Sequence, residues 1–292
     1  MTTRGSLRRR TLPALALLVT AAVGVAAPTE VGAQTPPTSY VALGDSFTAG
    51  PLIPNQETTP LGCLRSDHDY PHLVFPDTGT QTLRDVSCSG ADTDNFYEEH
   101  GVWPGPPNPP QLDALDANTR VVTVQMGGND IGFGGIIEDC VSALPFGSPC
   151  RDQYTAGGVD QLSARIAATG PKIAAGLDAI RTRSPLAEIL VVGYPTILPN
   201  TGVGCWPVVP MAWNDVTYIR AKHKELNAML ATQAAAKGAT YVDTYTPSIG
   251  RDACSSPLSR WVEPLIPLNL AAPFHPNARG MQGMATAVRA AL

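Results

Sequence analysis

Five short runs of apolar residues, rich in β-branched side chains, recur along the chain and predict buried strands. We expect these strands at 39–43, 81–86, 120–125, 188–192 and 240–245. Between them, apolar residues recur every three or four positions, which predicts helices. The helices are expected at 70–75, 159–182 and 213–237, and from Pro276 to the C-terminus. Gly170-Pro171 is expected to interrupt the second helix.

Strands that alternate with helices predict an α/β fold, a three-layer α/β/α sandwich with a central parallel sheet covered on both faces. Residues 51–69 and 87–119 are rich in Pro, Asp, Asn and Gly and are expected to stay irregular. In parallel sheets, sites form beyond the carboxyl ends of the strands. The first and third predicted strands end in GDSF and GGND, so polar residues stand where a site is expected.

The N-terminal segment has the pattern of a secretory signal peptide over residues 1–33. Four arginines precede an apolar stretch, and VGAQ at 31–34 offers small residues for cleavage after Ala33. The apolar run is short for a retained anchor, which is the alternative interpretation. The adjacent arginines are also a weak sign of twin-arginine export. Residues 34–292 are predicted to form a single domain, since no internal repeat or boundary interrupts them.

Composition narrows the class of partner. The chain has 292 residues, of which 43% are hydrophobic and 15% charged. Without residues 1–33, which hold four arginines and Glu30, 16 basic residues stand against 24 acidic ones, a net charge of −8. Because no basic cluster remains, nucleic acid is not an expected partner. Stable membrane insertion is not expected either, and the mature protein is expected to be a monomer.

Six cysteines lie in the predicted mature chain: Cys63, Cys88, Cys140, Cys150, Cys205 and Cys254. An even number in an exported protein is typical of disulfides, and six cysteines allow 15 connectivities. Pairing of neighbours (63–88, 140–150 and 205–254) is the simplest arrangement. A zinc site is the competing interpretation, but no pair has the two-residue spacing of a zinc knuckle.

Four segments hold residues that could act together in nucleophilic catalysis. Ser46 follows the first strand, and a serine nucleophile needs a base and preorganised donors for the oxyanion. Gly90 in SCSGA lets the backbone approach a ligand, and the Asn129 side chain in GGND is a neutral donor. His275 in PFHPNARG stands before a predicted helix, whose positive end favours a neutral imidazole. Taken singly, each motif is also explained as a turn, a helix cap or a loop.

In combination the motifs resemble the SGNH (GDSL-type) hydrolases, specifically the secreted, three-disulfide lipase/esterase group of actinobacteria. The stretches that carry the resemblance are GDSFTAG, CLRSDHDYP, SCSGA, GGND and HPNARG. The resemblance implies a flavodoxin-like fold, with Ser46 as nucleophile and His275 as base. It also implies an oxyanion hole built from the Ser46 N–H, the Gly90 N–H and the Asn129 side chain. No metal or organic cofactor is implied.

One position departs from the family pattern. The family commonly has an aspartate three residues before the histidine, where this chain has Ala272. Some members of the secreted group orient the histidine with a main-chain carbonyl. We therefore expect a carbonyl within residues 271–273, from Pro273 or Ala272, to accept the outward N–H of His275.

Other candidate sites have weaker support. His68, Asp69 and His72 have a spacing that resembles a metal site, but Pro71 lies within the segment. Asp92 and Asp94 could pair for glycoside hydrolysis. His100 and His223 are expected to be surface residues. Four loop aromatics could form an acyl pocket, or equally be core or exposed residues: Phe96, Tyr97, Trp103 and Trp206.

The sequence therefore predicts a secreted serine esterase or lipase acting through an acyl-enzyme, most favourably on acyl-chain lipid esters. Phospholipase and carbohydrate acetyl esterase activities remain open on the same fold. An acyltransferase and a non-catalytic surface-binding module are the alternatives from other functional classes.

Overall fold

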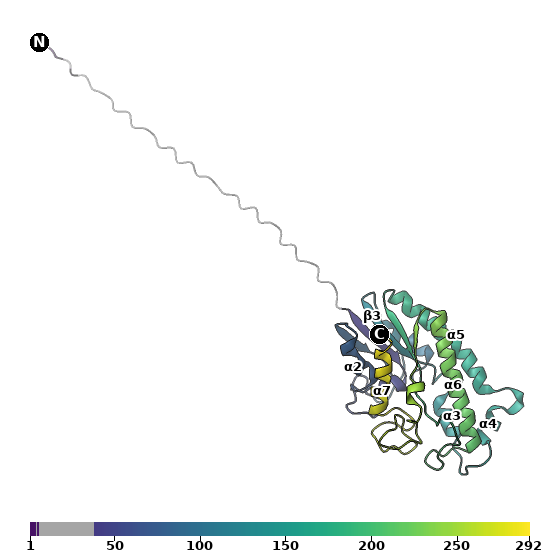
Figure 1. Ribbon diagram of the computed structural model, residues 1–292. Helices are drawn as coiled ribbons and strands as arrows, with labels where there is room; N and C mark the ends of the chain where they lie inside the picture. The colour runs from purple at the N-terminus through teal and green to yellow at the C-terminus, as the bar shows by residue number, and fades with distance from the viewer. Residues whose placement is uncertain (4, 6–37) are drawn as a thin grey trace. The chain divides into compact units, whose positions relative to one another are not determined.

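A parallel five-stranded sheet forms the centre of the part of the chain that the structure describes (Figure 1). This computed structural model describes residues 1–3, 5 and 38–292. The strand order is β2-β1-β3-β4-β5, and all neighbours are parallel. The strands are β1 (Ser39–Gly44), β2 (Thr82–Asp85), β3 (Thr119–Gln125), β4 (Glu188–Val192) and β5 (Thr240–Val242).

Helices cover both faces of this sheet. They are α1 (Ser46–Ala49), α2 (Tyr70–Val74), α3 (Phe133–Asp139), α4 (Pro149–Tyr154), α5 (Gln161–Arg183), α6 (Trp213–Ala236) and α7 (Ala278–Arg289). Short 3₁₀ turns occur at Leu61–Cys63, Phe75–Asp77, Thr93–Phe96, Gln111–Ala114, Ala156–Gly158 and Thr246–Ser248. Helices α5 and α6 pack together on one face, and α2 and α7 on the other (Figure 1). The three-layer α/β/α prediction is confirmed.

Alternation along the strands explains why the core has two parts. Val41 and Leu43 of β1 pack with α5 and α6, whereas Tyr40 and Ala42 pack with α2 and α7. Successive side chains of a strand point to opposite faces, so a strand buried on both faces has an uninterrupted apolar sequence. This is why the strand signal in the sequence was a continuous run.

Several predicted element boundaries were wrong. Helix α5 is unbroken, with Pro171 inside it. A Cβ at Gly170 would lie 3.3 Å from Gln233 and 3.5 Å from Met229 of α6, so α5 and α6 pack closely at this point, and tertiary packing outweighs the local preference of the Gly-Pro pair. Helix α7 begins at Ala278 with Asn277 as its N-cap, so Pro276 precedes the helix and does not head it. The fifth strand stops at Val242, three residues before the predicted end.

Helices α3 and α4 were not predicted, and both are too short to show a helical period in the sequence. The predicted irregular segments 51–69 and 87–119 contain only 3₁₀ turns and isolated bridges, apart from Thr119, the first residue of β3. The predicted signal peptide, 1–33, lies outside the described residues apart from positions 1–3 and 5, and the domain start at 34 stays a prediction.

Within the described part of the chain, no helix has the length and apolarity needed to span a membrane.

Three disulfides join the cysteines of residues 38–292. They pair Cys63 with Cys88, Cys140 with Cys150, and Cys205 with Cys254. This is the neighbour pairing expected from the sequence, and no cysteine of the described residues is left free. The zinc alternative has no thiolate available to it in this structure.

Candidate active site

Ser46 stands at the first position of α1, immediately after the turn that ends β1. Asp45 is the N-cap of this helix, and its carboxylate accepts the Phe47 N–H at 2.8 Å. Gly44 is required before it, because a Cβ there would lie 2.2 Å from Thr48 Oγ1. Among residues 38–292 the Ser46 N–H meets no acceptor, since it belongs to the open first turn of a helix. The turn therefore presents both the hydroxyl and a free N–H of Ser46.

His275 comes from the opposite end of the chain and contacts the serine directly. Its Nε2 lies 2.7 Å from Ser46 Oγ, and its Nδ1 lies 2.8 Å from the main-chain oxygen of Pro273. Because a carbonyl only accepts, Nδ1 carries the proton and Nε2 is the bare nitrogen. The expected carbonyl partner is thus present, at Pro273. No carboxylate of the described residues is bonded to this imidazole.

The surroundings of the imidazole favour its neutral form. The rings of Phe47 and Phe133 lie 5.0 and 5.9 Å from the His275 ring, centre to centre. Burial in this aromatic setting lowers the pKa of His275, and the Pro273 carbonyl opposes the shift. A neutral imidazole with its bare nitrogen on a serine hydroxyl is suited to accept a proton.

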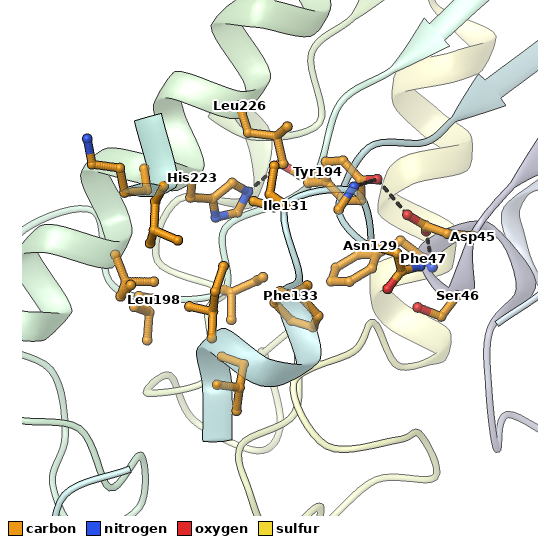
Figure 2. A pocket seen from close by; sticks show the side chains of 17 residues that line it. Asp45, Ser46, Phe47, Asn129, Ile131, Phe133, Tyr194, Leu198, His223 and Leu226 are labelled. Atoms are coloured by element: carbon orange, nitrogen blue, oxygen red, sulfur yellow. Dashed lines mark hydrogen bonds between the residues drawn. The ribbon is translucent and has the colours of Figure 1, made fainter. Parts of the chain in front are cut away.

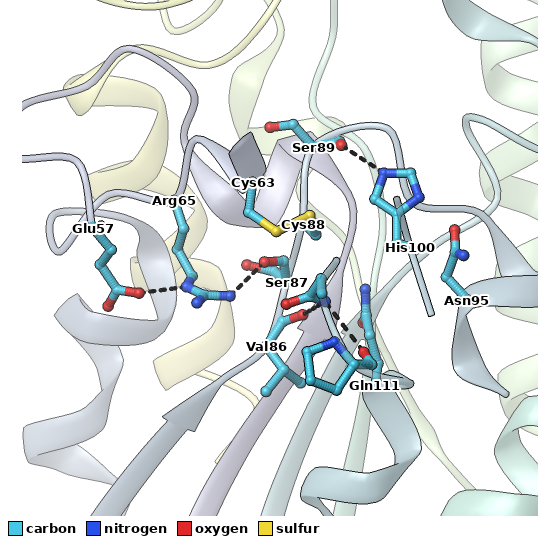
Figure 3. The surroundings of a disulfide bond; sticks show 12 residues. Glu57, Cys63, Arg65, Val86, Ser87, Cys88, Ser89, Asn95, His100 and Gln111 are labelled. Carbon is cyan, nitrogen blue, oxygen red and sulfur yellow. Dashed lines mark hydrogen bonds and ion pairs between the residues drawn. A yellow bond between two sulfur atoms is a disulfide. The ribbon is translucent and has the colours of Figure 1, made fainter. Parts of the chain in front are cut away.

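Gly90 and Asn129 line the same groove as Ser46 and His275. Gly90 has a φ of +88°, a conformation that few other residues adopt, and its N–H has no acceptor among residues 38–292. The Cys63–Cys88 disulfide holds this loop, and Ser89 donates its N–H to the Cys63 carbonyl at 3.0 Å (Figure 3). The Asn129 amide donates one N–H to the Ala91 carbonyl at 2.8 Å, which leaves its second N–H for a ligand.

Ser46, Gly90, Asn129 and His275 line one groove, together with Pro273 and Leu265. They come from the loops after β1, β2 and β3 and from the segment before α7. From β1 the chain adds β2 on one side of the sheet and β3 on the other. In parallel sheets, ligands bind at the carboxyl edge next to such a change of direction. The structure thus brings all four residues singled out from the sequence to one place.

A second, apolar cavity opens beside Ser46 and reaches back to α6 (Figure 2). It is narrow, with about 60 Å³ of space for the centre of a water-sized sphere. Its aliphatic and aromatic lining includes Ile131, Phe133, Ile136, Leu162, Ile197, Leu198, Ile219 and Leu226. Sequence reasoning missed these residues, because an apolar side chain that lines a cavity has the same pattern as one that fills the core.

A buried acid–phenol pair connects the loops around the site. The Tyr194 hydroxyl donates to Asp45 Oδ2 at 2.6 Å and accepts the Gly128 N–H at 2.9 Å (Figure 2). Burial raises the pKa of Asp45 to about 7, although the hydrogen bonds from Tyr194 and Phe47 oppose this. Tyr194 follows β4, so this pair links the ends of β1, β3 and β4. No motif in the sequence pointed to it.

The four loop aromatics do not line either cavity. Phe96 is buried against Gly176 of α5, Trp103 and Tyr97 are exposed, and the Trp206 indole donates to the Ser142 carbonyl. The cavity beside Ser46 is instead lined mainly by aliphatic side chains, and none of these four aromatics contributes to it.

Two histidines expected at the surface have structural contacts. His223 lines the apolar cavity, where burial lowers its pKa to about 4, and its ring nitrogen lies 3.3 Å from the Tyr194 carbonyl. His100 lies over Gly90 and contacts the Ser89 carbonyl at 3.1 Å. The prediction of surface positions was therefore wrong for His223, because the apolar wall of α6 extends around it.

The candidate acidic sites have structural partners. Asp92 caps a 3₁₀ turn and Asp94 contacts Lys172 at 3.1 Å, and neither lines the groove or the cavity. His68 pairs with Asp67, so it does not join His72 at a shared metal position. His72 Nδ1 instead lies 2.8 Å from Asp69, and these two form with Asp85 the one group of possible metal ligands among the described residues.

A parallel sheet whose carboxyl edge carries a contacting serine and histidine, free N–H groups and an apolar cavity is the arrangement of an ester hydrolase. The comparison with known families agrees. The chain belongs to the GDSL-like Lipase/Acylhydrolase family, whose model matches residues 42–282. The protein is a carboxylic ester hydrolase.

Relatives and solved structures extend this assignment along the chain. The protein is 40% identical over 277 residues to Lipase 2 of Streptomyces coelicolor, with 93% of this chain and 90% of that protein covered. It is 29% identical to an esterase of Streptomyces scabiei over 281 residues, covering 85% and 81% of the two chains. The crystal structure of an extracellular lipase from Streptomyces rimosus matches with a TM-score of 0.72 and 27% identity, covering 87% of this chain and all of that one.

Proposed function

We propose that this protein is a secreted serine esterase or lipase in which Ser46 is the nucleophile and His275 is its general base. The observation that carries the proposal is the 2.7 Å contact between His275 Nε2 and Ser46 Oγ, with Nδ1 held by the Pro273 carbonyl. His275 takes the hydroxyl proton as Ser46 Oγ attacks the ester carbonyl carbon. It then donates that proton to the leaving alcohol, and in the second half-reaction it activates water.

The charge that develops on the carbonyl oxygen needs donors that already point at it. The Ser46 N–H, the Gly90 N–H and the second N–H of Asn129 fill this role in the proposal. The support is their placement around one groove and the lack of acceptors for the two backbone groups within residues 38–292. Because these donors sit on a helix start, a disulfide-anchored loop and a strand end, they require little reorganisation during the reaction.

An acyl chain is the part of the substrate that fits the apolar cavity. The cavity begins at Ser46 and Asn129 and continues between aliphatic side chains, so a chain bound there would leave its ester carbonyl at the serine. This favours acyl-chain esters over acetylated carbohydrates, which would leave the cavity empty. Relatives that are called lipases support the same substrate class.

Secretion is part of the proposal, supported by the N-terminal pattern, the three disulfides and the extracellular S. rimosus relative. The mature enzyme is proposed to act as a monomer without a nucleic-acid partner, which fits its acidic balance.

The test is labelling by a fluorophosphonate followed by hydrolysis of p-nitrophenyl esters of increasing chain length. The parent protein should be labelled once per chain and should hydrolyse the esters, whereas Ser46→Ala should lose labelling and nearly all turnover at an unchanged unfolding temperature. Addition of an alcohol separates a hydrolase from an acyltransferase, since only the latter forms mainly a new ester. Parent-like activity of verified Ser46→Ala protein would refute the mechanism.

A further inference from the structure

The segment just before the His275 turn displays an unusual row of aliphatic side chains to solvent. Residues 264–270 read PLIPLNL, and we call this segment the 264–270 loop. The relative exposure of its side chains is 41% for Leu265, 76% for Ile266, 70% for Leu268 and 68% for Leu270. Single exposed aliphatic residues are ordinary on protein surfaces, but four within six positions form a patch that needs a partner.

The loop is held in a fixed shape by one buried acid. The Glu263 carboxylate accepts the N–H groups of Leu268 and Asn269 at 2.9 and 3.2 Å, and the side-chain amides of Asn269 and Asn277 at 2.7 and 2.6 Å. Glu263 is fully buried. These charge-assisted bonds keep the backbone polar groups of the loop inward while its aliphatic side chains face water. The exposure is therefore built into the fold.

The same acid connects the loop to the active site. The Glu263 N–H donates to the His275 carbonyl at 3.1 Å, and its carbonyl accepts the Phe274 N–H at 3.0 Å. Leu265 lines the groove that contains Ser46 and His275, so the aliphatic patch is continuous with the groove. Figure 1 shows the segment that precedes α7 at the same end of the domain as α3 and α4. A partner that binds the aliphatic patch would therefore lie next to the groove that contains Ser46 and His275.

The charges around the loop indicate which kind of surface it fits. No Asp, Glu, Lys or Arg occurs between Glu263 and Arg279, and the whole chain carries a net charge of −5. Attraction to an anionic membrane needs clustered basic residues, which are lacking here. In space, one exposed cation does contact the loop, because Arg279 donates to Asn269 Oδ1 at 3.2 Å. Aliphatic side chains beside an isolated cation fit an interface whose headgroups are neutral or zwitterionic.

We propose that the 264–270 loop docks the enzyme on an aggregated lipid phase with neutral or zwitterionic headgroups. Ile266, Leu268 and Leu270 insert between the headgroups, and the groove beside Leu265 receives the ester from the interface. This proposal rests on the proposed ester hydrolysis at Ser46 for its purpose, but the docking itself does not require turnover.

The binding test uses the Ser46→Ala protein and sedimentation with phosphatidylcholine vesicles, so that no lipid is consumed. The variant Ile266→Ser/Leu268→Ser/Leu270→Ser in this background should partition about tenfold or more weakly, since three aliphatic side chains no longer leave water. Leu186→Ser is the matched control, because Leu186 is 69% exposed but stands just before β4, at the opposite edge of the sheet. It should bind as the Ser46→Ala protein does.

The activity test uses the same triple variant with Ser46 intact. Hydrolysis of a short p-nitrophenyl ester, kept below its solubility limit, should stay within about twofold of the parent, while hydrolysis of an emulsified ester should fall by about tenfold. Equal vesicle binding by the triple variant and the Leu186→Ser control would overturn the proposal. A parent dimer that the triple variant converts to a monomer would also overturn it, by assigning the loop to self-association. If Ser46→Ala retained activity, the proposed function would be refuted. The vesicle assay would still test the docking role of the loop, because it measures binding and not turnover.

Discussion

The neighbours of His275 that bear on its proposed role as a base carry no charge. The Pro273 carbonyl fixes the proton on Nδ1, and the surrounding aromatic rings lower the pKa of the imidazole through burial. An aspartate in the place of the carbonyl would stabilise the imidazolium more strongly, but its own charge would have to be desolvated. The absence of an acid at Ala272 is therefore consistent with a working base.

Asn129 provides a test of the proposed oxyanion hole. Asn129→Ala should lower kcat by roughly 10²–10³, the usual cost of one such donor, with a smaller effect on KM. Steady-state kinetics on a p-nitrophenyl ester measure both constants. An unchanged unfolding temperature is the control, because the side chain also bonds to the Ala91 carbonyl. A change in KM alone would make Asn129 a binding residue instead.

Asp69 predicts a pH-dependent contribution to stability. Burial, and then the nearby carboxylate of Asp85, raise the pKa of Asp69 well above its usual value. The folded protein therefore holds a proton that the unfolded chain has released, and stability falls as pH rises between the two pKa values. The variant Asp69→Asn removes this titration. Its amide oxygen can still accept the His72 N–H. Its amide N–H can be donated to Asp85, whose Oδ2 has no hydrogen-bond partner within the described chain.

Urea unfolding of Asp69→Asn and parent protein at pH 5 and pH 8 measures this effect. The variant should gain stability relative to the parent as pH increases, because an amide does not titrate. A stability difference that is the same at both pH values would show that Asp69 ionises normally in the folded protein.

At the scale of elements, α7 fixes the segment that carries His275. Asn277 caps this helix and donates its own N–H to the Trp261 carbonyl at 2.8 Å. Gly280, one turn later, leaves no space for a side chain, since a Cβ would lie 2.5 Å from the same carbonyl oxygen. The close approach of helix and loop thus sets where the His275 turn can lie.

A pair of helix glycines tests this packing. Gly280→Ala should lower the free energy of unfolding by about 1–3 kcal/mol through overpacking, and should reduce kcat as the His275 turn moves. Gly135→Ala is the matched control, because Gly135 is an exposed residue of α3 with no atom near its missing Cβ. That control should raise stability by roughly 0.5–1 kcal/mol through better helix propensity. Urea unfolding separates the two, and similar effects in both variants would contradict this account.

At the scale of the whole molecule, the three disulfides close loops of different size. The bonded cysteines are separated by 25 residues in Cys63–Cys88, by 10 in Cys140–Cys150 and by 49 in Cys205–Cys254. All six bonded cysteines lie outside the five strands of the sheet. Covalent links therefore stabilise the loops that the parallel sheet leaves open.

Removal of each disulfide by paired Cys→Ser substitution should rank with loop size. The entropy of loop closure predicts losses of about 4 kcal/mol for Cys205–Cys254, about 3.5 for Cys63–Cys88 and about 2.7 for Cys140–Cys150. Denaturant unfolding of the three double variants measures the order. Loss of Cys63–Cys88 should also lower kcat, because this bond anchors the loop of Gly90. A largest loss for Cys140–Cys150 would contradict the entropic ranking.

The sequence by itself determined the fold class and the residues of the groove. Short continuous apolar runs that alternate with helical patterns predict parallel strands buried on both faces, and the polar motifs that follow such strands then lie at one edge of the sheet. Ser46, Gly90, Asn129 and His275 were recognisable only in combination, because each motif taken singly is also explained as a turn, a helix cap or a loop, whereas the set resembles the SGNH hydrolases. The carbonyl partner of His275 followed from the missing acid at Ala272.

Only the tertiary structure decided how the space around that groove is used. The apolar cavity is bounded by side chains that the sequence cannot separate from core residues, because both show the same helical spacing. Helix α5 continues through Pro171 because of its contact with α6, and local sequence rules do not include that contact. Likewise, the sequence does not show that the aliphatic residues of 264–270 face solvent, whereas the structure exposes them on a loop held by four hydrogen bonds to Glu263. Burial depends on which segments meet, and long-range contacts leave no signal in a local pattern.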